Sequence, residues 1–303
     1  MKVARAGMVR APPGIFFASR PMKYQKPYLN DAEKIVFLQQ HGMIVKDEGK
    51  AQKALELIGF SRFLGYATAF ADEEGKFLRQ TNFYAVLSVC RMDTKLRGLL
   101  FAALEKIELA LRSSWTGVFC ANFGPLGYLD PGHFEDAHLW DLHLQKLRTG
   151  WANLNDGAFK QYITKYDDPP LWFAVHALTF GSLSKWIVNS PATVQTEVWN
   201  RLGLGSMGKL HGVLKSLTIL RNFCAHHIPV WDAYFPIAFP DYRNDKVAGG
   251  KKIYHAIELI FMLLHRLEPE SRYAEEWKEN VNKLVSSYPA FLKKAMGFPK
   301  TKN

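Results

Sequence analysis

The sequence contains few cysteines and lacks long apolar runs. Its three cysteines, Cys90, Cys120 and Cys224, form no C-x-x-C pair, which excludes a disulfide framework and a cysteine zinc knuckle. This usage is typical of a reducing compartment, and we expect a cytoplasmic protein. The most apolar segment, residues 253–267, contains charged side chains, so we expect no membrane span. The N-terminus lacks the sustained apolar stretch of a secretory signal.

Acidic residues are absent from both ends of the chain. Residues 1–27 hold six lysines and arginines, and residues 280–303 hold five lysines. Between these two segments both signs are equal in number, so the formal net charge of +11 comes from the ends alone. This distribution argues against a protein whose entire surface coats a polyanion.

Alternating strand patterns and fixed-period repeats are also absent, whereas apolar residues at helical spacing are frequent. Hydrophobic residues make up 48% of the chain, which is enough for a large core. Asn30 followed by Glu33 resembles a capping box at the start of the first helix. We therefore predict an all-α fold with helices packed around one extended core. The expected helices cover residues 31–42, 47–58, 63–70, 83–119, 135–154, 172–180, 183–188, 193–202, 209–227, 251–267 and 274–287.

Three segments are expected along the chain. Residues 1–27, with several prolines and scattered bases, indicate a flexible basic arm. Residues 28–290 form the all-α domain, and residues 291–303 form a basic C-terminal tail. A connection rich in glycine and proline at 124–132 is a candidate subdomain boundary.

Common enzyme signatures are missing: there is no P-loop, G-x-S-x-G, H-E-x-x-H or G-x-G-x-x-G pattern. His133, His138 and His143 are spaced by five residues, so they do not share one face of a helix. Solvated polar residues explain them better than a metal site. We expect no metal and no cofactor.

The segment whose side chains are best suited to catalysis lies at the end of an expected helix. Arg221 can hold a phosphate through two parallel hydrogen bonds, and His226 and His227 can transfer protons near neutral pH. Asn222 lies one helical turn before His226, where its amide can orient the imidazole. Arg221 and His226 point about 140° apart around a helix, so a second helix or subunit must complete a pocket.

The spacing of Arg221 and His226 by itself also fits a simpler interpretation. Arginine and histidine are frequent enough in the chain for such a pair to occur by chance. In that interpretation the histidines occupy a polar last turn, at the negative end of the helix dipole.

A family resemblance favours the chemical interpretation. The blocks that carry it are Lys26-Pro27-Tyr28-Leu29, residues 57–66, Met92-Asp93-x-x-Leu96-Arg97, Ile107-Glu108-x-x-x-Arg112, residues 180–184 and Arg221-Asn222-x-x-Ala225-His226. In these blocks the chain resembles the Abi-like (AbiD/AbiF-type) abortive-infection proteins of bacteria, and its motif resembles the Arg-x4–6-His motif of HEPN ribonucleases. One departure is that the family often has another arginine after the motif, near the tryptophan, where this chain has His227 before Trp231, which leaves open whether His227 takes over a phosphate contact.

The resemblance implies a HEPN-like helical bundle that forms a homodimer, with motifs from two copies facing one cleft. It also implies metal-independent RNA cleavage by a toxin in phage defence, in some relatives under the control of a small RNA. Arg221, His226 and Asn222 are then the catalytic residues, and Glu108, Arg112 and His227 support them. Glu108 and Arg112 alternatively form an ordinary ion pair one helical turn apart.

RNA binding is expected to involve the basic ends and two aromatic residues that follow the motif. The candidates are Lys2, Arg5, Arg10, Arg20, Lys23, Lys26, Lys293, Lys294, Trp231 and Tyr234.

Two other functions stay open on the sequence. The first is a non-catalytic RNA-binding or regulatory module that forms a ribonucleoprotein complex, in which the motif only grips phosphate. The second is a HEPN partner of a nucleotidyltransferase. The toxin of such pairs usually carries a tyrosine two positions after the histidine, whereas this chain has Ile228.

Overall fold

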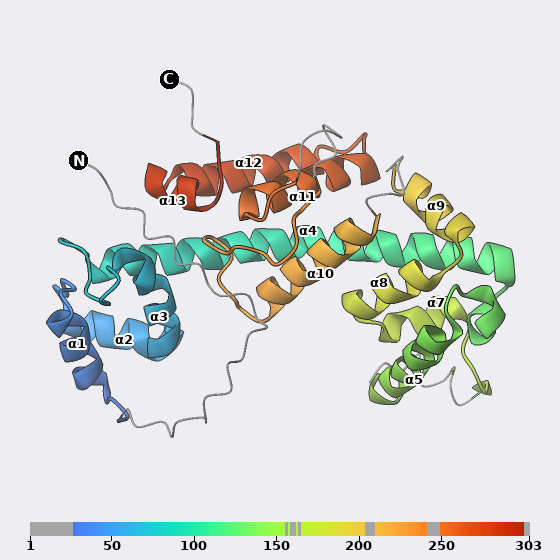
Figure 1. Ribbon diagram of the computed structural model, residues 1–303, viewed down its shortest axis with the longest axis horizontal. Helices are drawn as coiled ribbons and strands as arrows, with labels where there is room; N and C mark the ends of the chain where they lie inside the picture. Colours follow the sequence, from blue (N-terminus) through green and yellow to red (C-terminus); the bar gives the residue numbers. More distant parts are fainter. Residues whose placement is uncertain are drawn as a thin grey trace. The chain divides into compact units, whose positions relative to one another are not determined.

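The computed structural model describes residues 27–154, 157, 162, 165–203, 210–240 and 249–299. These residues form twelve α-helices and four short 3-10 helices, and the described chain contains isolated β-bridges in place of strands (Figure 1). The predicted all-α class is confirmed. No helix among the described residues is long and apolar enough to cross a membrane. The expected flexible arm, residues 1–27, falls outside the described residues except for Pro27.

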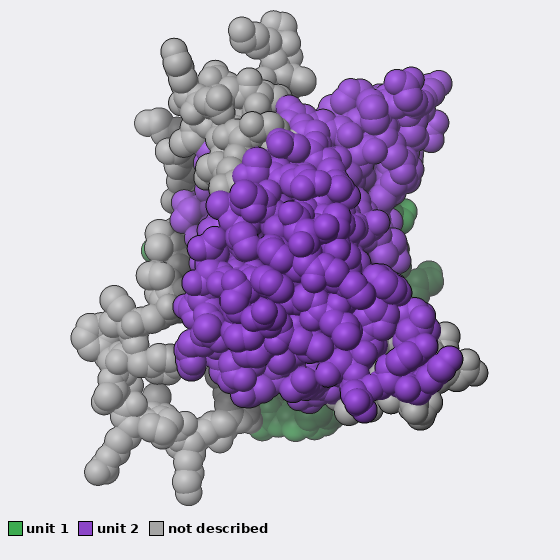
Figure 2. Space-filling model, turned by 90° about the vertical axis from the view of Figure 1, so that its right-hand side faces the viewer, with its two compact units in different colours: residues 1–95 green, residues 96–303 purple. Residues whose placement is uncertain are grey.

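The chain divides into two compact units, residues 1–95 and 96–303, which Figure 2 colours separately. The division falls inside one helix, α4 (Phe83–Phe123). The connection at 124–132, our candidate boundary, instead lies within the second unit. It is tied there by Tyr128, whose buried hydroxyl donates to the Pro169 carbonyl at 2.6 Å.

The first unit contains three short α-helices, one 3-10 helix and the start of α4. Both hydrogen bonds of the predicted capping box are present, Glu33 N to Asn30 Oδ1 at 3.0 Å and Asn30 N to Glu33 Oε2 at 2.7 Å. The buried Asp93 of α4 accepts a hydrogen bond from the Tyr66 hydroxyl at 2.7 Å. The helices are α1 (Asp31–Gln40), α2 (Glu48–Ile58), α3 (Phe60–Ala67) and η1 (Thr68–Phe70).

The second unit packs its helices around the remainder of α4. The Trp277 indole of α12 donates to the Leu99 carbonyl at 2.9 Å, and the Trp115 indole of α4 donates to Ser190 Oγ, just after α8, at 2.9 Å. The expected helix over 172–180 is interrupted, because α7 and η4 end before α8 begins. The elements are η2 (Gly127–Leu129), η3 (Pro131–His133), α5 (Ala137–Asn153), α7 (Leu171–Ala174), η4 (Val175–Ala177), α8 (Phe180–Asn189), α9 (Ala192–Arg201), α10 (Leu210–Ala225), α11 (Ile253–Leu267), α12 (Tyr273–Ser286) and α13 (Ala290–Ala295).

The C-terminal segment differs from the expected tail. Residues 290–295 form the short helix α13, whose Leu292 is buried together with Met296 just beyond it. The Tyr254 amide of α11 donates to the Met296 carbonyl at 3.1 Å, and the rings of Tyr254 and Phe298 lie 5.1 Å apart. Apolar burial therefore holds this basic segment against the second unit as far as Phe298.

Candidate functional site

The motif lies at the C-terminal end of α10, a helix with one buried face. This face holds Leu217, Leu220 and Cys224 among other residues, and it leaves Arg221 half-buried and Asn222 exposed. An amphipathic helix packed on a core in this way presents its polar last turn to solvent.

α10 ends earlier than the predicted residue 227, because His227 leaves the helix in the left-handed conformation with φ of 58°. The Ile228 amide donates to the Phe223 carbonyl at 2.8 Å, and the His227 amide donates to the Cys224 carbonyl at 3.3 Å. These two hydrogen bonds define a Schellman motif, which satisfies carbonyls at the helix end. His226 is consequently the C-cap residue rather than part of the helix.

His226 and His227 are both exposed. The His226 amide donates to the Asn222 carbonyl at 2.9 Å, which fixes the backbone of the turn. Within the described part of the chain, no side-chain hydrogen bond joins Asn222 to His226. The backbone, rather than the Asn222 amide, therefore places the imidazole in this structure.

Arg221 lies beside the predicted supporting pair on α4. Glu108 Oε1 accepts from Arg112 Nη2 at 2.7 Å, and Glu108 Oε2 lies 3.8 Å from Arg221 Nε. One carboxylate thus faces two guanidinium groups, one from its own helix and one from the motif. The structure brings together three of the residues that the sequence singled out, although they come from distant parts of the chain.

Arg112 is held on its other side by main-chain oxygens. Its guanidinium donates to the carbonyl of Val175 and, at 3.1 Å, to that of Leu178. Both carbonyls belong to the turn between α7 and α8. The sequence offered no signal for these acceptors, because any residue type supplies a carbonyl. Both terminal nitrogens of Arg112 are therefore engaged by the protein, which gives this residue a bracing position.

The Glu108–Arg112–Arg221 cluster carries a formal charge of +1. The side chains of Arg112 and Glu108 are 11% and 14% exposed, whereas that of Arg221 is 28% exposed. Among the described carboxylates, Glu108 is the one that pairs with Arg221. The excess positive charge therefore resides on the outermost guanidinium, where it can bind an anion such as a phosphate.

The two aromatic residues after the motif have different environments. Trp231 is 4% exposed and therefore buried, so its ring is not accessible for stacking on a base in this structure. Tyr234 is 71% exposed, and Nζ of Lys251 lies 5.4 Å from the centroid of its ring. No local pattern indicated this lysine, because it lies far from Tyr234 in the sequence.

The predicted RNA-binding bases divide into two groups. Lys293 and Lys294 lie on α13, where Lys294 is exposed and Lys293 half-buried. The others lie outside the described residues: Lys2, Arg5, Arg10, Arg20, Lys23 and Lys26.

The three histidines around α5 have separate environments. His133 Nδ1 lies 2.9 Å from the Gly127 carbonyl, and its ring stacks on Phe123 at 4.2 Å. His138 is exposed, whereas His143 is buried. Across the described residues, no group of three His, Cys, Asp or Glu side chains is placed to hold a metal ion.

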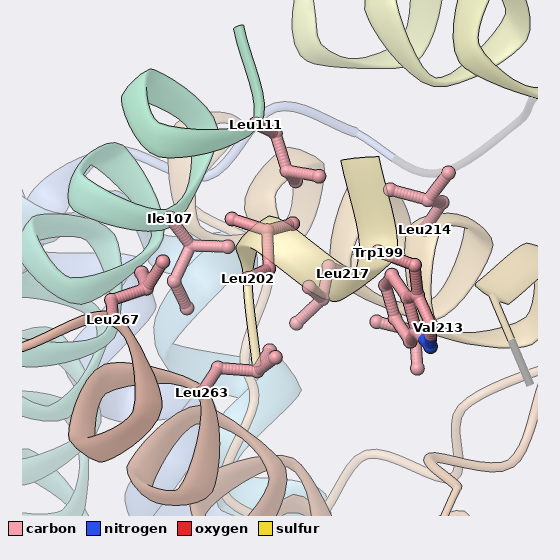
Figure 3. Close-up of a pocket in the computed structure, with 9 residues that line it drawn as sticks. All are labelled: Ile107, Leu111, Trp199, Leu202, Val213, Leu214, Leu217, Leu263 and Leu267. Atoms are coloured by element: carbon pink, nitrogen blue, oxygen red, sulfur yellow. The ribbon is translucent and has the colours of Figure 1, made fainter. Parts of the chain in front are cut away.

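A small cavity in the second unit is lined by apolar side chains alone (Figure 3). Its volume of about 10 Å³ is at the lower limit for one water molecule, and no polar side-chain group points into it. It is therefore a packing defect between α4, α9, α10 and α11 rather than a substrate pocket. Its lining residues are Ile107, Leu111, Trp199, Leu202, Val213, Leu214, Leu217, Leu263 and Leu267.

Comparison with known proteins adds one match. The family described as Abi-like protein matches residues 53–232, which include the second half of α2 and the whole of α10 with its terminal turn. No curated protein and no solved structure matches the chain.

Proposed function

The chain belongs to the Abi-like protein family, and we propose that it is a HEPN-type RNA endonuclease that acts as a toxin in bacterial abortive infection. The family match covers more than half of the chain and includes the motif. In this proposal the enzyme needs no metal, acts in the cytoplasm, and is controlled by a small RNA.

The observation that carries the proposal is the placement of Arg221. Its guanidinium lies at the surface of the second unit, next to a carboxylate that Arg112 already neutralises. Glu108 Oε2 lies 3.8 Å from Nε, so the ion pair restrains the guanidinium from one side, and no other described carboxylate pairs with it. A restrained arginine of this kind suits the two parallel hydrogen bonds of a bound phosphate.

The proposed reaction starts with attack of a ribose 2′-oxygen on the adjacent phosphorus. The bond from phosphorus to the 5′-oxygen breaks, which leaves a cyclic phosphate and a free 5′-hydroxyl. His226 transfers the proton that moves in this step, and Arg221 stabilises the negative charge that develops on the phosphate oxygens. Asn222 orients His226 once RNA is bound, and His227 supplies a further phosphate contact.

A second copy of the chain completes the site in this proposal. Arg221 and His226 start from different sides of the last turn of α10, so one motif offers an open surface rather than an enclosed pocket. Two motifs facing each other in a homodimer enclose the RNA between them.

The test compares motif variants with surface controls. We expect Arg221→Ala and His226→Ala each to lower RNA cleavage by about 100-fold or more, and to remove toxicity on expression. Arg201→Ala and His265→Ala are matched controls, because both residues sit in exposed ion pairs, with Glu197 at 2.7 Å and Glu275 at 3.0 Å. Full activity in both motif variants contradicts the proposal. A protein that binds a defined small RNA but cleaves no RNA indicates the regulatory module instead.

A further inference from the structure

Tyr234 and Lys251 form an exposed aromatic–cation pair close to the motif. The Tyr234 ring is largely accessible, and the ammonium group of Lys251 lies 5.4 Å from its centroid. We infer that this pair, called here the Tyr234 platform, stacks an unpaired base of single-stranded RNA beside the end of α10. The inference rests on the proposed function, and it defines the class of RNA that the site takes.

The platform is fixed to the motif by buried aromatic contacts. Phe235, the neighbour of Tyr234, is buried, and its ring lies 5.0 Å from that of Phe223 in the last turn of α10. The Phe235 amide donates to the Lys251 carbonyl at 2.9 Å, which places the lysine beside the same segment. Phe235 therefore anchors the main chain next to Tyr234 to the last turn of α10, while the Tyr234 side chain is exposed.

The charge of the platform comes from Lys251. Its neighbour Lys252 binds Asp232, with Nζ 3.1 Å from Oδ1 and 3.2 Å from the carbonyl oxygen. Among the described residues, no carboxylate pairs with Lys251. Nζ of Lys251 lies over one face of the Tyr234 ring, so a base can stack on the opposite face while the ammonium group binds its phosphate by charge.

This chemistry selects single strands over duplexes. Every base has a π face, so stacking on Tyr234 tolerates any sequence, but the base must first leave its own stack. A base within a duplex is already stacked and paired. We therefore expect the enzyme to cut unpaired RNA, with one base near the scissile bond held on Tyr234.

The experiment measures binding separately from cleavage. The probe is a fluorescent 2′-O-methyl RNA, which lacks the attacking hydroxyl and stays intact, and the readout is anisotropy. We expect Tyr234→Ala to weaken single-strand binding about tenfold and Tyr234→Phe to retain it. Lys251→Gln should reduce the slope of log affinity against log salt by about 0.7, the value for one phosphate that is no longer neutralised.

A matched control exists elsewhere on the second unit. Lys165 Nζ lies 5.4 Å from the centroid of the half-exposed Tyr166, the same pairing at the same distance, but on the segment before α7. Tyr166→Ala and Lys165→Gln should leave RNA binding unchanged. The inference is overturned if the variants of both pairs lose the same RNA affinity, or if Tyr234→Ala loses none. It is also overturned if Tyr234→Ala weakens binding to a duplex probe as much as binding to the single strand. So does a wild-type protein that binds no single-stranded RNA.

Two comparisons separate this inference from its premise and from a membrane role. If Arg221→Ala abolishes cleavage while Tyr234→Ala binds normally, the platform fails and the proposed function stands. If RNA binding depends on Tyr234 but cleavage is independent of Arg221 and His226, the platform stands and the proposed function fails. Vesicles of anionic phospholipid test whether the platform binds a membrane surface instead of RNA. If Lys251→Gln weakens binding to the vesicles but leaves binding to RNA unchanged, the assignment to RNA is overturned.

Discussion

At the residue scale, His143 links the stability of the fold to pH. Burial lowers the pKa of His143, Lys185 and Lys146 lower it further, and Asp136 opposes them. A lowered pKa means that the folded protein holds the imidazole neutral where the unfolded chain already binds a proton. The free energy of unfolding therefore decreases as the pH falls below about 6.5, the ordinary pKa of histidine.

We predict that His143→Leu makes stability less dependent on pH between about 5 and 7. Each tenfold difference in proton affinity between the folded and unfolded states corresponds to about 1.4 kcal/mol. Urea unfolding midpoints at a series of pH values measure this difference. His138→Leu is the control, because His138 is exposed on the same helix. Parallel pH profiles for the wild type and His143→Leu contradict the assignment.

Single residues of the site were predictable where their chemistry is local. Arg221, Asn222 and His226 stand in one short segment, so residue type and spacing marked them as candidates, and the family resemblance favoured them over the simpler interpretation. The contact between Glu108 and Arg221 depends on how α10 packs against α4, which no local pattern encodes. For the same reason the sequence could not tell that Trp231 is buried while Tyr234 is exposed.

At the scale of the element, the end of α10 shows a conformation that favours glycine. His227 has a φ of 58°, where a side chain with a Cβ atom is strained. We predict that His227→Gly raises the free energy of unfolding by about 1 kcal/mol, because glycine adopts this conformation without strain. Chemical denaturation of the two proteins measures the difference.

The matched control is His226→Gly, because His226 does not have a positive φ. Glycine there brings only its larger loss of chain entropy, so we expect no gain in stability. A His227→Gly protein that is less stable than the wild type contradicts the strain argument. If the variant is more stable yet cleaves RNA more slowly, His227 contributes a contact to the RNA at the cost of stability.

Elements with a long period or a specific cap were predictable, and the very short helix α13 was not. The regular apolar spacing of α4 and the Asn30–Glu33 pair indicated the right type and nearly the right start. α13 has six residues and few apolar positions, too short for a helical period to appear. The segment is buried because it contacts α11, and such a contact between distant parts of the chain cannot be predicted from the local sequence.

At the scale of the whole molecule, the excess positive charge resides at the two ends of the chain, outside the cluster around Arg221. The cluster of Glu108, Arg112 and Arg221 contributes one net positive charge, which is too little to bind a long RNA strongly. We predict that deleting residues 1–26, which carry six bases and no acid, weakens RNA affinity and flattens its salt dependence. Cleavage of saturating RNA should be unchanged.

Binding titrations at several salt concentrations measure this effect. The slope of log affinity against log salt should fall by about 0.7 for each phosphate that the deleted bases neutralise in the full-length protein. A full-length variant with the six bases replaced by glutamine separates charge from chain length. If the deletion leaves both affinity and slope unchanged, the N-terminal bases serve solubility rather than RNA binding.

The helix α4 has a consequence for how the molecule can be divided. It contains 41 residues, and the boundary between the two compact units falls inside it, between Lys95 and Leu96. Cutting the chain at that point breaks a helix, because no flexible linker joins the two units there. The cut leaves four carbonyls on one fragment and four amides on the other without their helical partners. The two units are therefore compact but not severable, and neither is a ready-made domain for separate expression.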